Sequence, residues 1–438
     1  MRRTILLLAT VALTLLVASG VALALGVGSA AADGSVVGPG ESIQKAINAA
    51  DPGDTIVVRG VHKEDVIIRK DGIKLRGEDA VIEPPAKADS PCSRLVGPEA
   101  ICLWGDFNIN TGKLTGPRVS DVSVSGFTFR GFKIKGKGGN EAFVIDVYAA
   151  RNATVVGNRV IGNIPGGMAF GKNVNTTVAK NHVVGNPKNV TKGISVGGDS
   201  RNTKVVNNVV RSYPEGTNAI DLEEAIDTTV AGNDLIGNGV GVFGEQNTTG
   251  TKILSNDISR SSIVGIFMTG PKPANAKVVG NNISGGPWGI FITDTHRGSI
   301  VGNKVHDNCA GMFFEAFGPV GNFKVTGNTV ADNTRSCRAA QFDRNFSGIG
   351  IALLGASGME VTANHLSGNV PSGPTAASGG VVVATDPNFG VEAKPKNNTV
   401  SANHFGRNKP DIFYDGSGTG NRFTANLCDK SVPGSLCN

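Results

Sequence analysis

Short β-favouring triplets separated by a single asparagine recur along the chain. In residues 154–163, "TVVGNRVIGN", Asn158 stands between two such triplets although asparagine is a poor strand former. The pattern V-x-x-N-x-V returns ten more times, with allowances, at steps of 22 to 39 residues. The asparagines are Asn158, Asn181, Asn208, Asn233, Asn256, Asn281, Asn303, Asn328, Asn364, Asn403 and Asn426. Steps mostly in the low twenties, with strand chemistry, predict a solenoid of stacked coils.

Each coil is expected to hold three short strands, with the asparagine at a bend between two of them. Asparagine tolerates the left-handed backbone conformation better than other residues with a side chain, so we expect the asparagine to adopt it. Amides stacked about 4.8 Å apart should form a hydrogen-bonded ladder. A second asparagine follows five residues later in seven coils, at Asn163, Asn186, Asn238, Asn308, Asn333, Asn369 and Asn408.

The third strand of a coil often starts at glycine, as in "GIFITD" from Gly289. Period-2 alternation points Ile290 and Ile292 inward and the residues between and after them outward. Aligned on that glycine, the second position reads Ser195, Asp221, Phe243, Phe267, Phe291, Phe313 and Ala352. The fourth position reads Gly197, Glu223, Glu245, Thr269, Thr293, Glu315 and Leu354. Two outward columns, one aromatic and one partly acidic, are therefore predicted on one face.

The end coils of a solenoid need caps, because they expose core and strand edges. In "ESIQKAINAADPGDTIVV", Ser42 can cap a helix with apolar positions at helical spacing. These positions are Ile43, Ala46, Ile47 and Ala50. Pro52 and Gly53 end the helix, and residues 55–58 begin the first strand. At the other end, a loop closed by Cys428 and Cys437 is expected to cover the last coil.

Residues 1–32 are interpreted as an export signal, which leaves 33–438 as a single domain. Arg2 and Arg3 precede an almost continuously apolar stretch, and residues 30–32 are small residues suited to cleavage. The apolar stretch is long enough to remain as an anchor, but no positively charged stop follows it, which favours cleavage. We therefore predict a secreted, extracellular protein without a membrane partner after cleavage.

Composition agrees with an exported β protein that does not bind nucleic acid. Gly is abundant at 61 residues and aromatic residues make up 5%. The net charge of +6 is a weak excess without a dense Lys/Arg stripe, which argues against nucleic acid. Six cysteines fit an oxidising compartment and allow fifteen pairings. Proximity favours Cys92–Cys102, Cys309–Cys337 and Cys428–Cys437.

Residues 42–77, together with the asparagine repeats, resemble the right-handed parallel β-helix proteins of the pectate-lyase-like superfamily, in particular a subgroup of secreted bacterial repeat proteins. The resemblance covers essentially all of 33–438. It implies an all-β, right-handed parallel β-helix of three strands per coil and roughly a dozen coils, with an N-terminal capping helix. The subgroup mixes polysaccharide lyases, hydrolases and epimerases with non-enzymatic copper-protein maturation factors and surface proteins, so the fold does not settle function.

The sharper signatures of that superfamily are missing. The chain lacks the paired aspartates of polygalacturonases and the Arg-x-Pro-x-x-Arg of pectate lyases. The Asp-Pro-His motif of alginate epimerases is matched only in part by residues 386–388, where Asn388 replaces histidine. Each of these specific activities is therefore in doubt.

Carboxylates on neighbouring coils are the candidate catalytic groups. Glu223 and Glu245 share a column, and Asp294 lies one position out of column with Glu315. Two close carboxylates raise one pKa, so that one holds a proton while the other stays ionised, as acid/base work on a sugar requires. His296 could act as a base.

Substrate binding is assigned to aromatic and cationic residues near these acids. Arg297 could neutralise a uronate carboxylate. Trp288 is the preferred sugar-stacking residue, and Phe267 and Phe291 could form a stacking floor. Residues 334–347 could instead fold over this phenylalanine column.

No metal or cofactor is assigned. Asp221, Glu223 and Glu224 could bind calcium, but alternation sends Glu224 away from the other two. Copper delivery would want Met/His/Cys clusters, and none is evident. His62, His182, His365 and His404 are interpreted as scattered turn or surface residues.

The leading hypothesis is a monomeric secreted protein that binds an extracellular polysaccharide along the glycine-initiated strands. Whether it is an enzyme stays open. If it is, it would be a polysaccharide lyase, glycoside hydrolase or uronate epimerase, in which Asp294 and Glu315 act as the general acid and general base. The alternative is a non-catalytic surface, binding or maturation-factor-like β-helix protein, in which the phenylalanine column is fully covered.

Overall fold

The structure is a computed structural model. It describes residues 35–87, 92, 99–133, 142–163, 166–186, 192–213, 216–245, 247–272, 274–339, 344–386 and 392–437. The predicted export signal lies outside these residues. Gly34–Asn438 forms one compact unit. Within the described ranges, no helix has the length and apolar character needed to cross a membrane.

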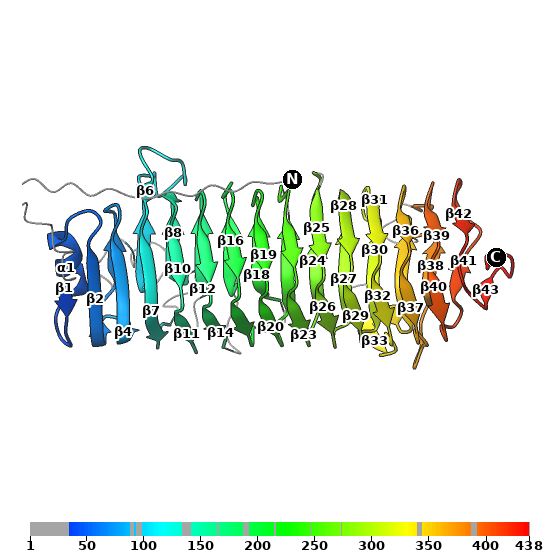
Figure 1. The fold of residues 1–438 in the computed structure, drawn as a ribbon, viewed down its shortest axis with the longest axis horizontal. Helices are drawn as coiled ribbons and strands as arrows, with labels where there is room; N and C mark the ends of the chain where they lie inside the picture. Colours follow the sequence, from blue (N-terminus) through cyan, green and yellow to red (C-terminus); the bar gives the residue numbers. More distant parts are fainter. Residues whose placement is uncertain are drawn as a thin grey trace, which may run out of the picture. The chain divides into compact units, whose positions relative to one another are not determined.

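Parallel strands stack coil upon coil, in chain order (Figure 1). One coil contains β18 (Asn218–Glu223), β19 (Thr229–Ala231) and β20 (Asp234–Ile236). These strands pair in parallel with β21 (Val240–Glu245), β22 (Lys252–Leu254) and β23 (Asp257–Ser259) of the next coil. The predicted parallel β-helix with three strands per coil is confirmed.

The glycine-initiated strands form a 14-stranded sheet among the described residues. Besides β18 and β21, its strands are β3 (Val66–Ile68), β5 (Ile101–Trp104), β8 (Phe143–Tyr148), β12 (Gly166–Gly171), β15 (Ile194–Gly197), β24 (Val264–Met268), β27 (Trp288–Thr293), β30 (Ala310–Glu315), β35 (Ile349–Leu354), β38 (Gly379–Ala384), β41 (Ile412–Tyr414) and β43 (Ser431–Val432). The other two strands of each coil join a 25-stranded sheet, mostly as segments of three residues.

The core is a set of aliphatic columns between the two sheets. Ile290 and Ile292 are fully buried, as alternation predicts. Register places Ile266 and Met312 on either side of Ile290. Because each coil buries its inward side chains only against its neighbours, stability depends on stacking.

An uninterrupted amide ladder joins the coils, and it confirms the sequence repeat. Asn158 donates from Nδ2 to Oδ1 of Asn181 at 3.1 Å, and the same bond repeats through all eleven asparagines to Asn426. A second ladder runs through Asn308, Asn333, Asn369 and Asn408. These amides are buried except that of Asn408, which is half-buried, and they bind backbone groups that the bend removes from the sheets.

The expected backbone conformation of the asparagine is wrong. The residue before the asparagine adopts the left-handed conformation, for example Gly157 (φ 67°), Lys180 (φ 55°) and Ser255 (φ 52°). In each of these turns, the residue with the left-handed backbone conformation is therefore the solvent-exposed one. The asparagine that follows keeps ordinary dihedrals and points its amide into the ladder.

The predicted helix at the first coils is present as α1 (Ile43–Ala49). The Ser42 hydroxyl accepts a hydrogen bond from the Lys45 N–H, and Ile43 and Ile47 are buried. The helix contacts β1 (Ser35–Val37), β2 (Thr55–Lys63) and β3.

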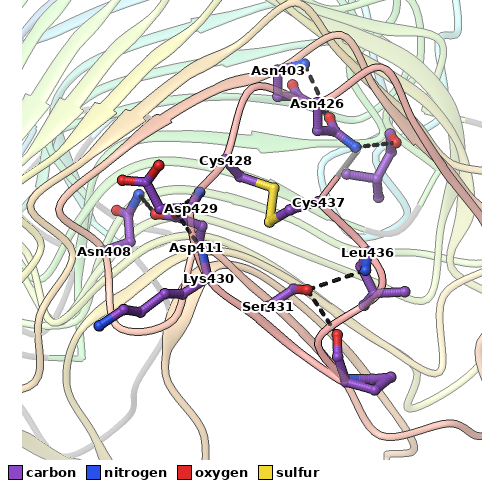
Figure 2. The surroundings of a disulfide bond; sticks show 12 residues. Asn403, Asn408, Asp411, Asn426, Cys428, Asp429, Lys430, Ser431, Leu436 and Cys437 are labelled. Atoms are coloured by element: carbon purple, nitrogen blue, oxygen red, sulfur yellow. Dashed lines mark hydrogen bonds between the residues drawn. A yellow bond between two sulfur atoms is a disulfide. The ribbon is translucent and has the colours of Figure 1, made fainter.

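All three predicted disulfides are present: Cys92–Cys102, Cys309–Cys337 and Cys428–Cys437. Figure 2 shows the last of them beside Asn403 and Asn426, where the amide ladder ends. Asp411 closes the neighbouring turn, because its Oδ2 accepts hydrogen bonds from the Asp429 and Lys430 N–H groups.

Candidate functional site

The outward face of the 14-stranded sheet carries the two predicted columns. Register pairs Asp221 with Phe243, then Phe267 and Phe291. In the second column, Glu223 pairs directly with Glu245. The repeat therefore brings residues some two dozen positions apart into contact, as predicted.

Three carboxylates meet on β18 and β21, and we call Asp221, Glu223 and Glu245 the acid cluster. One carboxylate oxygen from each lies within 4.8 Å of the others. Glu245, rather than Glu224, thus completes the group that could bind calcium. Glu224 lies in a left-handed turn and accepts a hydrogen bond from the Asn247 side chain.

The members of the acid cluster differ in accessibility. Asp221 is fully buried, and its carboxylate binds the Lys192 Nζ at 2.9 Å and the Asn218 Nδ2 at 2.6 Å. Glu223 keeps 40% of its side chain exposed and lies 3.6 Å from the same ammonium. Asp221 is thus held inside a buried, hydrogen-bonded ion pair, whereas Glu223, which contacts the same lysine, keeps solvent-accessible surface.

The phenylalanine column is covered at one end only. The Phe243 and Phe267 rings stack at 5.0 Å between centroids, and both side chains are half-buried. Phe291 and Phe313 are buried beneath Phe346 and its neighbours. Aromatic surface therefore remains partly open next to Glu245 and is closed farther along the column.

The cover is a hairpin of β33 (Cys337–Ala339) and β34 (Arg344–Phe346), within the insert predicted for this role. The Cys309–Cys337 disulfide ties it to the coil, and Phe346 packs edge-on against Trp288 and Phe313. The full cover that the non-catalytic alternative expects is found over Phe291 and Phe313, but not over Phe267.

Trp288 and Phe291 do not offer open ring faces for sugar stacking. Each side chain is only 4% exposed, and the two rings stack on each other at 5.6 Å. The sequence places Phe291 on the outward face and Trp288 just before its strand, but the hairpin makes this region a second apolar core. Of the predicted stacking residues, Phe267 keeps accessible surface.

The second predicted acid site spans a corner of the coil. Asp294 (φ 54°) follows β27 at a turn, after which His296 and Arg297 begin β28 (His296–Val301) in the 25-stranded sheet. Glu315 ends β30 opposite Thr293 and is 2% exposed. Because Asp294 Oδ1 has no hydrogen-bond partner, this atom does not bind Glu315.

Partial burial, through desolvation, raises the pKa of the Asp294 carboxyl. Arg297 is exposed and His296 is half-buried. Glu315 belongs to the 14-stranded sheet, and His296 and Arg297 belong to the 25-stranded sheet. Asp294 lies at the turn between the two sheets.

A further acidic group on the same outward face was missed by sequence reasoning. The Trp104 Nε1–H donates to Asp146 Oδ2 at 2.6 Å, and desolvation raises the pKa of Asp146 to about 6. Desolvation, and then the Asp146 charge, raise the pKa of buried Glu99 well above its usual range. Extending the first outward column toward the N-terminus would have found Asp146, since it pairs with Cys102 and Ala169.

Comparisons with known proteins agree with the coil architecture. The sequence model of the family described as "Right handed beta helix region" matches residues 218–389. The one described as "Periplasmic copper-binding protein (NosD)" matches residues 123–272. No match was found among curated protein sequences.

Two solved structures share the fold. The mannuronan C-5 epimerase AlgE6 A-module of Azotobacter vinelandii has a TM-score of 0.50 and 15% identity, covering 88% of this chain and 94% of that one. The tailspike protein of E. coli bacteriophage HK620, in complex with a pentasaccharide, has a TM-score of 0.58 and 11% identity, covering 89% of this chain and 69% of that one. Likeness at these identities shows the fold alone.

The residues matched by the copper-binding family do not form a copper site. Residues 123–272 contain one histidine, His182, and no cysteine. The two methionines in this range, Met168 and Met268, are buried and belong to the aliphatic core. Copper prefers imidazole, thiolate and thioether ligands, so we derive no chemistry through copper from this match.

By their printed names, one structural neighbour is a mannuronan epimerase and the other is in complex with a pentasaccharide, and the fold and the family models agree with one another. The coil order, the asparagine ladder and these matches lead to one conclusion: the chain is a parallel β-helix repeat protein, similar over residues 218–389 to the right-handed β-helix family.

Proposed function

We propose that the protein is exported and binds an extracellular polysaccharide on the outward face of the 14-stranded sheet, at the acid cluster and the adjoining Phe243 and Phe267. The observation that carries this proposal is the contact between an accessible carboxylate row and a half-buried aromatic stack on one face. The epimerase and tailspike neighbours support the ligand class, since both use this fold with sugar polymers or oligosaccharides by their printed names.

The chemistry of the face suits sugar rings. Ionised carboxylates accept hydrogen bonds from hydroxyl groups, and Glu223 and Glu245 present two such acceptors side by side. Aromatic rings pack against the apolar C–H faces of sugars, which Phe243 and Phe267 can do. Strands spaced about 4.8 Å apart repeat these contacts along the stack, so an extended polymer fits better than a compact small molecule.

Binding measurements on a glycan array test the proposal. Glu223→Gln with Glu245→Gln removes two negative charges and changes the acceptors, and Phe267→Ala removes the open aromatic surface. Both variants should weaken binding at least about tenfold, the equivalent of 1.4 kcal/mol. Glu360→Gln is the matched control, because Glu360 is an exposed acid on β36 (Glu360–Thr362) of the other sheet. Equal binding by all variants would refute the site.

Processing of the bound polymer is the second candidate function, with Asp294, Glu315 and His296 as its acid/base groups. The raised pKa of Asp294 favours it, because a general acid must hold a proton near the working pH. Asp294→Asn combined with Glu315→Gln should abolish turnover of a polysaccharide that the wild-type protein depolymerises or epimerises. Unchanged turnover would remove these residues from the mechanism while leaving the binding face intact.

A further inference from the structure

Two histidines that sequence reasoning treated as scattered meet on the 25-stranded sheet. His365 begins β37 (His365–Ser367), and His404 begins β40 (His404–Gly406) of the next coil. Register pairs them directly, although 39 residues separate them in the chain. Both are exposed. Their Nδ1 atoms lie 3.0 Å apart, and the ring planes differ by 13°.

We propose that His365 and His404 form a binding site for a divalent transition-metal ion of the Ni²⁺, Cu²⁺ and Zn²⁺ group. Metal–nitrogen bonds to imidazole are about 2.0–2.1 Å long, so two adjacent ligands of one ion lie about 2.9–3.4 Å apart. The observed 3.0 Å separation lies within this range, so both nitrogens can reach one ion once the two rings, which are stacked with centroids 4.9 Å apart, turn to converge on it. Imidazole suits these ions, whereas calcium and magnesium prefer oxygen.

The coil holds the backbones of the two histidines in register without the metal. Each histidine directly follows a ladder asparagine, and Asn364 donates from Nδ2 to Asn403 Oδ1 at 3.0 Å. This bond fixes the register of the two strands, so little backbone freedom is lost when an ion binds. Because both rings are exposed, an ion can enter from solvent and complete its shell with water.

The site is separate from the copper-binding family match and from the proposed sugar face. His365 and His404 lie outside residues 123–272 and on the other sheet from the acid cluster. Their outer neighbours in the column are Thr329 and Leu427, and neither side chain carries a charge that would repel a cation.

Calorimetric titration with Cu²⁺ and with Zn²⁺ tests the proposal on the exported chain, prepared without a polyhistidine tag. One equivalent of ion is expected to bind. His365→Gln and His404→Gln should each weaken ion binding roughly a hundredfold, because each variant keeps only one of the two imidazole ligands. Electron paramagnetic resonance of the Cu²⁺ complex should show two coupled imidazole nitrogens, and a single nitrogen in either variant.

His182→Gln is the matched control. His182 occupies the same repeat position after Asn181, but its column neighbours are Arg159 and Val209, so it has no second imidazole. This variant should bind the ion as the wild type does. Thermal unfolding in the absence of ion should be the same for all variants, and added ion should raise the midpoint of the wild type and His182→Gln only.

Two results would overturn the site. One is wild-type affinity in both His365→Gln and His404→Gln, which would place the ion elsewhere. The other is no one-equivalent binding by the wild type, which would mean that the two rings only share a proton between their Nδ1 atoms.

Discussion

Asn256, in the middle of the ladder, binds four neighbouring groups through one amide. Its Nδ2 donates to Asn281 Oδ1 at 2.9 Å and to the Val230 carbonyl at 3.0 Å. Its Oδ1 accepts from both the backbone N–H and the Nδ2 of Asn233. A single side chain thus satisfies backbone groups at a bend where no strand partner is available.

Asn256→Ala should lower the free energy of unfolding by about 1–3 kcal/mol, because it leaves buried donors and acceptors without partners. Denaturant titration followed by circular dichroism measures the change. Asn282→Ala is the control, since Asn282 lies outside the ladder and binds the exposed Asp257. Equal losses in the two variants would mean that the buried ladder is not the source of the stability.

Asp146 makes stability depend on pH in a defined window. Desolvation raises its folded pKa from 3.8 to about 6, so the folded state holds the proton more tightly than the unfolded state. Stability attributable to this group is therefore highest in acid, falls as the pH rises from about 4 to about 6, and is constant above that.

Asp146→Asn should remove this dependence while retaining an acceptor for the Trp104 Nε1–H. The stability of the variant relative to wild type should increase across that window, as measured by denaturant midpoints at half-unit pH steps. A constant difference between the two proteins across the window would contradict the assignment.

At the scale of elements, the hairpin β33–β34 decides which aromatic residues face solvent. It is attached through Cys309–Cys337 and packs Phe346 against Trp288. Without the disulfide, the hairpin should separate from the sheet more easily, since its covalent attachment to the coil is lost.

Cys309→Ser with Cys337→Ser, in a Trp104→Phe background, should increase quenching of Trp288 fluorescence by iodide. Trp104 and Trp288 are the two tryptophans of the chain, so this background reports on Trp288 alone. Cys428→Ser with Cys437→Ser is the control, because that disulfide closes the last coil. Quenching that rises equally in both double variants would indicate general loosening.

Element positions were predictable from sequence, but exposure was not. The repeat predicted which residues share a column, for example Glu223 with Glu245, because the register follows from the asparagine spacing. It did not predict that Trp288 would be buried, since the hairpin folds back through contacts with residues of other coils. Propensity and alternation describe a strand and its two faces, and they do not describe what an insert covers.

The histidine pair was predictable in principle. Residues 363–365 and 402–404 both read Ala-Asn-His at the same repeat position on consecutive coils. Comparing repeat positions for every polar residue type, rather than for acids and aromatics alone, would have placed His365 against His404. The raised pKa values of Glu99 and Asp146 were not accessible this way, because they arise from burial.

At the scale of the whole coil stack, close approach of neighbouring backbones limits which residues can start a strand of the 14-stranded sheet. A Cβ on Gly265 would lie 2.5 Å from the Gly289 carbonyl oxygen on the next coil. The same approach recurs at Gly241, Gly289, Gly311 and Gly350. These glycines allow the coils to pack at strand spacing where the chain enters the sheet.

Gly265→Ala should therefore cost about 1–3 kcal/mol through overpacking between coils. Gly406→Ala is the control, because a Cβ there meets nothing within 4 Å. Calorimetric unfolding should show a lower midpoint for the first variant and a nearly unchanged one for the second. A midpoint unaffected by Gly265→Ala would show that neighbouring coils can separate at no cost.

The ladder bonds all run the same way along the chain, from each Nδ2 to the Oδ1 of the following coil. Aligned amides of this kind add their dipoles, as peptide groups do in a helix. Each coil of the ladder therefore presents amide donors toward the C-terminal side of the stack and amide acceptors toward its N-terminal side, so the ladder has one polarity along the stack.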